Sequence, residues 1–333
     1  METQAEIPEF EPTAAGAAVG LVLVLASIAL FPLGRALALR LFPRRNVIFA
    51  RWGFFHVGLA IFTYFTLTIL GGMLLRAAGV SLSGGIAPVV FGALLQVATV
   101  ALCFVFARRL DPEGIAALGF RSGGNVRALG VGVLAYGFGI PAIMGAMLLS
   151  AWSWKALGVE APPQEVLKLV LELEGAERVV FVLLAVALIP LCEELFFRGY
   201  LTQQLAARIP HPLVWGLLPS LAFGLAHTAN GGGDTQFAIY YVAVATLLGL
   251  VMTALVWRTG GLAAAMGFHL MNNIGAMLMI GIAGVTPPIS LFVMDYSTMI
   301  GSASTDVLVL GLLLAFVLSP FAPLPKGQPL RRK

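Results

Sequence analysis

The polar residues that could do chemistry in this chain lie inside long apolar stretches. They form three short patterns: Glu193-Glu194 with Arg198, Phe223 with His227, and His269 with Asn273. A charged side chain at the centre of a bilayer costs about 2.5 to 3.5 kcal/mol on insertion scales, so such residues are typical of a functional site. Carboxylates, imidazoles and an amide are the groups that activate water and stabilise an oxyanion during hydrolysis.

The acidic pair in the first pattern contains one residue with an evident partner. Glu194 and Arg198 are four residues apart with the acid first, which places them on one helix face in the favourable order. We therefore predict a buried ion pair between them, although such a pair can also serve only to join two helices. Successive helical side chains point about 100° apart, so Glu193 faces a different neighbour. Glu193 is thus the candidate general base.

The two histidine patterns bring further donors and acceptors from other helices. His227 follows Phe223 by four residues and Asn273 follows His269 by four, so each pair shares a helix face. A carboxylate with a histidine can polarise water, and a histidine with an asparagine amide can stabilise the oxyanion of a tetrahedral intermediate. The set is that of water-mediated amide hydrolysis. A lone histidine in an apolar helix more often makes an interhelical hydrogen bond, and we interpret His56 in that way.

The composition predicts that transmembrane helices carry these residues. Of the 333 residues, 59% are hydrophobic and only 11% are charged, against about 25% charged in soluble proteins. A spanning helix needs about 20 mainly apolar residues. Nine segments meet or approach this length, at residues 15–33, 54–75, 86–107, 128–152, 179–197 (extended to about 207), 213–227, 237–257, 262–283 and 307–321. We predict an all-α fold, a polytopic transmembrane helix bundle with about eight or nine spanning helices.

The basic residues give this bundle an orientation. Sixteen of the 20 lysines and arginines fall on one side of a nine-helix arrangement. The positive-inside rule places that side in the cytoplasm, so we expect the N-terminus outside and the C-terminus in the cytoplasm, with the chain integral to the plasma (inner) membrane. The net charge of +4 then reflects loops that face anionic headgroups. The expected partner is the lipid bilayer, and no nucleic acid is expected.

The depth of the site sets a geometric requirement. Glu193 and His269 suit a cavity that opens to the cytoplasm, but His227 lies about 15 residues into its helix, or about 22 Å at 1.5 Å per residue. We therefore expect a tilt of this helix, or a break at Pro219, to bring His227 level with the other residues.

The three patterns resemble the signature motifs of the CAAX prenyl endopeptidase family, which includes the bacterial CAAX protease and bacteriocin-processing (CPBP) membrane proteins. The flanking runs Phe197-Arg198-Gly199-Tyr200-Leu201 and Thr259-Gly260-Gly261-Leu262 are similar to the family as well. The resemblance covers about residues 179–283. It implies a CPBP-like catalytic helix bundle at residues 128–284, with the motifs within 179–284. Transmembrane helices of unassigned role precede it at residues 1–127, and a helix and basic tail follow at 285–333.

The resemblance implies an enzyme, an intramembrane protease that hydrolyses peptide bonds. It assigns water activation to Glu193 and His227, the oxyanion hole to His269 and Asn273, and a supporting role to Glu194 and Arg198. Eukaryotic members of the family remove the last three residues from prenylated CAAX proteins, whereas prenylated protein substrates are not generally expected for the bacterial relatives. The implied partner is therefore a peptide or prenylated-protein substrate, cut near the C-terminus of a membrane-associated protein.

The resemblance favours a metal-free, glutamate-dependent mechanism with no cofactor. Zinc is the alternative, with Glu193, His227 and His269 as ligands and a fourth position open. The chain lacks the H-E-x-x-H arrangement that places two zinc ligands one helical turn apart.

Two other classes of function remain open. A non-catalytic immunity or partner-binding protein of the same family could keep the motifs for structure, and it would tolerate Glu193→Gln. A secondary transporter would also place polar groups at mid-membrane, but inverted repeats are expected there. The sequence shows no internal repeat.

Overall fold

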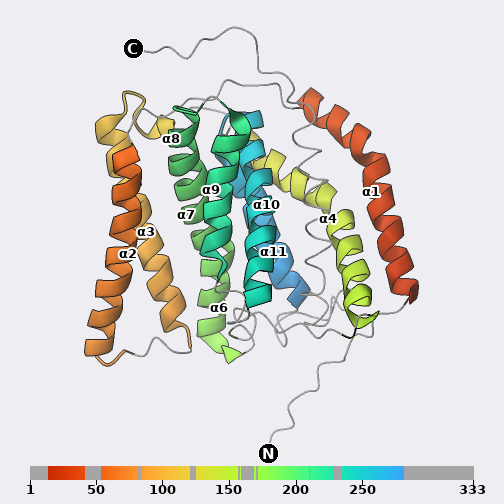
Figure 1. The fold of residues 1–333 in the computed structure, drawn as a ribbon, viewed down its shortest axis with the longest axis horizontal. Coiled ribbons are helices and arrows are strands. Elements are labelled where there is room, and N and C mark those ends of the chain that lie inside the picture. Colours follow the sequence, from red (N-terminus) through yellow and green to blue (C-terminus); the bar gives the residue numbers. More distant parts are fainter. Residues whose placement is uncertain are drawn as a thin grey trace, which may run out of the picture.

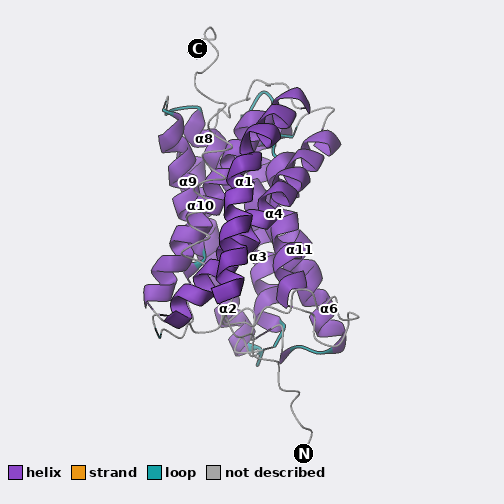
Figure 2. Ribbon diagram, turned by 90° about the vertical axis from the view of Figure 1, so that its right-hand side faces the viewer, coloured by secondary structure: helices purple, strands orange, loops and turns teal. Residues whose placement is uncertain are grey.

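The computed structural model of the chain describes residues 14–41, 54–80, 85–120, 125–156, 158, 169, 172–209, 211–228 and 235–280. Every regular element within these ranges is a helix (Figure 2). The predicted all-α fold is therefore confirmed.

The helices follow the predicted segments closely. Their bounds are α1 (Ala14–Leu41), α2 (Phe54–Ala77), α3 (Ala87–Leu110), a short η1 (Gly114–Leu118), α4 (Asn125–Ala156), α6 (Gly175–Leu183), η2 (Leu184–Leu188), α7 (Ile189–Glu194), η3 (Leu195–Leu201), α8 (Thr202–Ala206), α9 (Pro212–Ala226), α10 (Thr235–Thr259) and α11 (Ala263–Ile280). The run from α6 to α8 is one continuous helix. Eight of the nine predicted segments are thus helical, and the ninth, at residues 307–321, lies outside the described residues together with the basic C-terminal tail.

Several helices meet the requirements for crossing a membrane. Among the described residues, Phe55–Ala77, Ala87–Leu110 and Gly175–Ala206 are long and apolar enough to span a bilayer, and Ala14–Ala26, Leu213–Ala226 and Tyr241–Trp257 are shorter apolar helices. Large apolar side chains also point outward, for example Phe55, Phe62 and Leu74 on α2. Outward apolar surface of this kind suits contact with lipid, and the chain is an integral membrane protein.

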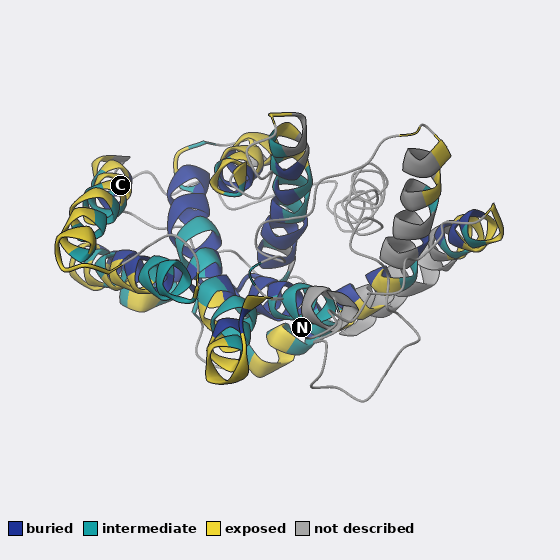
Figure 3. Cartoon of the chain, turned by 90° about the horizontal axis from the view of Figure 1, so that it is seen from below, coloured by how far each residue is buried: buried dark blue, intermediate teal, exposed yellow. Residues whose placement is uncertain are grey.

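The helices that carry the three motifs lie in the middle of the bundle (Figure 1). α11 packs on α4, α10 and α7, and α9 packs on α10. α1 packs on α4 at one edge, and α2 pairs with α3 at the other. The main buried cluster includes Phe223 of α9, Met252 of α10 and Phe268 of α11. Seen from below, buried residues gather on these central helices whereas α2 is largely exposed (Figure 3).

Two glycines allow α11 to approach α4 at backbone distance. A Cβ atom at Gly132 of α4 would overlap the carbonyl oxygen of Ala264, and one at Gly267 of α11 would overlap the carbonyl oxygen of Leu129. Small residues at helix interfaces are the usual means of close packing in membranes, where no hydrophobic effect drives helices together. This contact fixes the height and rotation of α11, which carries His269 two residues after Gly267.

Candidate active site

The acidic pair lies in a short α-helical stretch between two π-helical segments. Before it, the backbone N–H of Ile189 donates to the carbonyl of Leu184, five residues back. After it, the N–H of Thr202 donates to the carbonyl of Phe197, again five residues back. Segments of π-helix are rare and often occur at functional sites, because the wider turn rotates the following side chains relative to an α-helix.

Glu194 and Arg198 form the predicted ion pair. Nη1 of Arg198 lies 2.8 Å from Oε1 of Glu194, and both side chains are fully buried. The guanidinium carbon also lies 4.3 Å from the centroid of the Phe223 ring, a cation–π contact from α9. Gly249 of α10 leaves the room for this arrangement, since a Cβ there would lie 2.9 Å from Nη2 of Arg198. Arg198 is therefore a buried structural cation and gives no information about membrane orientation.

His269 contacts both glutamates through opposite ring nitrogens. Nδ1 lies 2.9 Å from Oε1 of Glu194, and Nε2 lies 3.7 Å from Oε2 of Glu193. Because a carboxylate only accepts hydrogen bonds, Nδ1 of His269 carries a proton and donates a hydrogen bond to Glu194. The 3.7 Å separation is longer than a direct hydrogen bond, and Glu193 is 15% exposed whereas Glu194 is not exposed at all. The pair is thus divided into an anchored and an available carboxylate.

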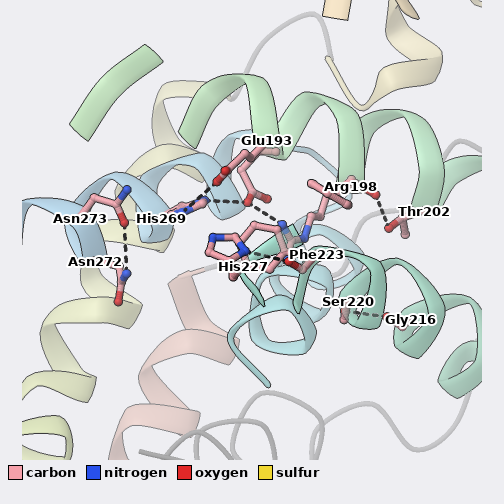
Figure 4. A network of polar contacts seen from close by, with 12 residues as sticks. Glu193, Arg198, Thr202, Gly216, Ser220, Phe223, His227, His269, Asn272 and Asn273 are labelled. Carbon is pink, nitrogen blue, oxygen red and sulfur yellow. Dashed lines mark hydrogen bonds and ion pairs between the residues drawn. The ribbon is translucent and has the colours of Figure 1, made fainter. Parts of the chain in front are cut away.

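His227 caps the C-terminal end of α9 with its proton position defined. Nδ1 lies 2.7 Å from the backbone carbonyl of Phe223. A carbonyl accepts only, so Nδ1 donates and the neutral ring keeps its lone pair on Nε2. The Phe223 ring lies 4.5 Å from the His227 ring and 5.8 Å from the His269 ring, measured between centroids. Phe223 therefore holds the histidines of two helices around one buried aromatic ring (Figure 4).

Asn273 lies one turn after His269 and is held by two hydrogen bonds. Its Nδ2 donates to the backbone carbonyl of Ala185 in η2 at 2.8 Å, and its Oδ1 accepts from Nδ2 of Asn272 at 3.2 Å. Neither Ala185 nor Asn272 was a candidate in the sequence analysis. The only signal in the sequence is Pro190, which removes a backbone donor from the helix containing Ala185.

A tilt of α9 or a break at Pro219 was expected, and the structure shows no break, because α9 continues through Pro219. Ala206 ends the helix that carries the glutamates and lies twelve residues beyond Glu194, which corresponds to about 18 Å. α9 then returns as a continuous helix of 15 residues through Pro219 to His227, or about 22 Å. Because the two helices are antiparallel and these lengths differ by less than one helical turn of about 5.4 Å, Glu194 and His227 lie at similar heights.

Five of the six predicted residues form one connected group, whereas Asn273 is hydrogen-bonded to Ala185 and Asn272 instead. Glu193, Glu194, Arg198 and His269 are linked by ion pairs, and Phe223 connects them to His227. In the part of the chain that the structure describes, no hydrogen bond or ion pair joins His227 to Glu193. Over the same residues, no three His, Cys, Asp or Glu side chains lie close enough to hold a metal ion. The alternative zinc ligands Glu193, His227 and His269 therefore do not form a ready site.

Fold and site together define a class, an all-helical membrane protein with buried and partly buried carboxylate, imidazole and amide groups on its central helices. Residues 175–275 match the family described as Type II CAAX prenyl endopeptidase Rce1-like, and all six site residues lie within this match. This segment is therefore Rce1-like, which confirms the resemblance of the motifs.

One curated bacterial protein is also similar to part of the chain. The chain is similar to the uncharacterized protein YyaK of Bacillus subtilis (strain 168), with 33% identity over 106 residues, covering 30% of this chain and 34% of that protein. The chain thus spans about a third of the length of the curated relative it matches. No solved structure matches.

Proposed function

We propose that this protein is an intramembrane endopeptidase that hydrolyses a peptide bond of a membrane-associated protein with water activated by Glu193 and His227. The observation that carries the proposal is the unequal environment of the two glutamates. Glu194 is fully buried and bonded to Arg198 and His269, whereas Glu193 is 15% exposed and 3.7 Å from His269. Glu193 is therefore the carboxylate available to take a proton from water.

In the proposed reaction, Glu193 accepts a proton as the water oxygen bonds to the carbonyl carbon of the substrate. His227 supports this step as an acceptor, because its Nδ1 is engaged with the Phe223 carbonyl and its lone pair lies on Nε2. The tetrahedral intermediate then breaks its carbon–nitrogen bond as Glu193 returns the proton to the leaving amine. The products are a carboxylic acid and an amine, which become a carboxylate and an ammonium ion by transfer of the remaining proton, and no metal takes part.

The oxyanion of the intermediate is stabilised by donors on α11. Asn273 offers the second hydrogen of its Nδ2, since the first is donated to Ala185. His269 donates from Nε2 when the ring carries both protons, and the contact of Nδ1 with Glu194 fixes the orientation of the ring. Donors held before substrate binds are worth most in a site shielded from water, where they need no reorganisation during the reaction.

The proposed substrate class is a membrane-associated protein or peptide cut near its C-terminus, with prenylated CAAX-type proteins first. The support is the family match over residues 175–275. We further propose that the chain lies in the plasma membrane with its N-terminus outside and its C-terminus in the cytoplasm. The support is the asymmetric distribution of lysine and arginine along the sequence, leaving out the buried Arg198.

The test is mass-spectrometric analysis of a prenylated CAAX-type peptide incubated with the purified protein in lipid. Wild type is expected to cut three residues from the end, with or without a chelator, and Glu193→Gln is expected to be inactive. Glu177→Gln is the matched control, because Glu177 is an exposed glutamate in the first turn of α6. A peptide of the same sequence without the prenyl group measures the contribution of the lipid.

Two results would contradict the proposal. Cleavage by Glu193→Gln at the wild-type rate would exclude Glu193 as the base. Binding of both peptides by wild type without cleavage would favour the non-catalytic, partner-binding alternative.

A further inference from the structure

We propose that Pro190 and Asn272 are positioning residues that set the side-chain amide of Asn273, Pro190 by leaving one backbone carbonyl without a helical donor and Asn272 by holding the amide oxygen. The structural part of this inference concerns three hydrogen bonds, from Ile189 to Leu184, from Asn273 to Ala185 and from Asn272 to Asn273. Its catalytic consequence rests on the proposed function of Asn273. Neither residue belongs to the three motifs.

The backbone carbonyl of Ala185 lacks a hydrogen-bond donor within its own helix. In η2, the N–H of Ile189 donates to the carbonyl of Leu184, which is the π-helical register. The next donor in this register would serve the carbonyl of Ala185, but the next residue is Pro190, which has no N–H. The donor that would reach Ala185 in α-helical register is Ile189 itself, and it is already engaged. The carbonyl of Ala185 must therefore accept from outside its own helix.

The donor to Ala185 comes from α11. Nδ2 of Asn273 lies 2.8 Å from the carbonyl oxygen of Ala185, across 88 residues of sequence. A backbone carbonyl without a donor is costly in the apolar interior of a membrane protein. The bond therefore does two things: it satisfies Ala185, and it joins α11 to the helix that carries Glu193 and Glu194.

The orientation of the Asn273 side-chain amide follows from its two hydrogen-bond partners. The Ala185 carbonyl can only accept, so the NH₂ end of Asn273 must face it, and the amide oxygen must face the other way. That oxygen accepts from Nδ2 of Asn272 at 3.2 Å. Both ends of the amide are thus specified, and one hydrogen of Nδ2 is left for a substrate. An oxyanion donor held in this way before substrate binds needs no reorganisation in the transition state.

The decisive experiment is a double-mutant cycle on stability, which needs no enzymatic activity. Asn273→Leu alone removes the donor and leaves the Ala185 carbonyl unsatisfied, so it lowers the melting temperature of the full chain in lipid nanodiscs. Pro190→Ala restores a backbone N–H, after which either residue 189 or residue 190 can reach Ala185. In the Pro190→Ala background, Asn273→Leu is expected to cause less than half of its original loss in melting temperature.

The matched control uses the proline of the neighbouring helix. Pro219 lies inside α9, and Pro219→Ala restores a backbone donor far along the chain from Ala185. It is expected to leave the effect of Asn273→Leu unchanged. An equal loss of melting temperature in the wild-type, Pro190→Ala and Pro219→Ala backgrounds would overturn the inference.

Asn272 provides a second cycle that decides the same question if Pro190→Ala does not fold. Asn272→Asp places an acceptor against the Asn273 amide oxygen, and Asn272→Leu removes the donor. Both are expected to lower the melting temperature when Asn273 is present, Asp more than Leu, and to have little effect in the Asn273→Leu background. Equal losses in both backgrounds would show that Asn272 acts independently of Asn273 and would overturn its role.

Peptide cleavage separates a positioning role from a structural one. Asn273→Leu is expected to lower kcat about 10²- to 10³-fold, as loss of one oxyanion donor does, with KM little changed. Pro190→Ala and Asn272→Leu are expected to lower kcat by less, and neither should lower it further when combined with Asn273→Leu. Additive losses of kcat would overturn the positioning role. If wild type cleaves no peptide, the proposed function fails, and the stability cycles still decide the hydrogen bonds of Asn273 with Ala185 and with Asn272.

Discussion

Glu194 and His269 lie 75 residues apart in the chain, yet Oε1 of the glutamate is 2.9 Å from Nδ1 of the histidine. The same oxygen is 2.8 Å from Nη1 of Arg198, and all three side chains are buried. One carboxylate oxygen therefore holds a donor from its own helix and a donor from α11. Its neighbour Glu193 is left partly exposed beside the other nitrogen of the histidine. The two adjacent glutamates thus have different environments, and substitution of each one can test whether their roles differ.

The first prediction is that the two glutamates differ in their effect on stability. Glu194→Gln removes the charge that balances Arg198, and an unbalanced charge from a broken buried pair costs about 3 to 5 kcal/mol. Glu193→Gln changes a partly exposed carboxylate with no direct hydrogen bond to His269. Thermal unfolding in lipid nanodiscs, followed by tryptophan fluorescence, should show a large decrease in melting temperature for Glu194→Gln and a small one for Glu193→Gln.

A double variant serves as the control for this prediction. Removing both charges with Glu194→Met and Arg198→Met leaves no unpaired buried ion, so the double variant is expected to be more stable than either single variant. A double variant that loses the sum of the two single losses would show that the ion pair does not couple the two residues.

The second prediction concerns the aromatic ring at the centre of the site. Phe223 is 1% exposed and lies against Arg198 and both site histidines. Phe223→Leu keeps an apolar side chain but removes the cation–π contact, which is worth up to about 2 kcal/mol when desolvated. We expect a measurable loss of stability together with reduced cleavage, because Arg198 and His269 lose a common support.

The control for Phe223 lies on the outer surface. Phe62 of α2 is 67% exposed, and Phe62→Leu should change the free energy of unfolding by no more than about 0.5 kcal/mol. Equal effects of the two Phe→Leu substitutions would show that the contacts of the Phe223 ring contribute no specific stability.

The third prediction tests the backbone contact that places α11. Gly132→Ala would put a methyl group into the carbonyl oxygen of Ala264, and backbone cannot move aside as a flexible side chain does. We expect a loss of about 1 to 3 kcal/mol, typical of overpacking, and lower activity because His269 and Asn273 shift with α11. Gly137→Ala in the same helix is the matched control, since its Cβ would meet no atom within 4 Å. That variant should be neutral or slightly stabilised by reduced backbone entropy in the unfolded state.

What was predictable from the sequence depends on the range of the interaction. The helices and the Glu194–Arg198 pair follow from apolar length and from spacing of four residues, which are local properties. The meeting of His269 with both glutamates does not, because it depends on the height and rotation of α11 relative to α7. Gly132 and Gly267 allow the close contact between α4 and α11 that sets this placement. The spacing of the motifs does not indicate which helix packs against either glycine.

The π-helical segments of the acidic helix were not predicted from the sequence. The extension of the acidic helix to about residue 207 was predicted, and the helix ends at Ala206. The hydrogen bond from Ile189 to Leu184, five residues back, leaves the pattern of apolar residues unchanged, so a hydropathy analysis cannot detect it. Pro190 was visible, but its consequence for the Ala185 carbonyl and for Asn273 requires the position of α11.

The last prediction concerns the proton on His227. Donation from Nδ1 to the Phe223 carbonyl leaves the lone pair on Nε2 of the neutral ring, so 15N spectra of histidine-labelled protein should show this tautomer in a signal that disappears in His227→Gln. We expect His227→Gln to lower kcat about 10²- to 10⁴-fold, as loss of an acid–base group does. Its effect on stability should be small, because the ring is half-buried at the end of α9.

The matched control is the histidine at the other end of the same helix. His211 is exposed and makes no side-chain hydrogen bond to the first turn of α9, so His211→Gln should keep the wild-type kcat. If His227→Gln also kept the wild-type kcat while Glu193→Gln were inactive, Glu193 would activate water without a histidine on α9. The bond between His227 and Phe223 would then serve only to terminate α9, and the same spectra would still show its proton on Nδ1.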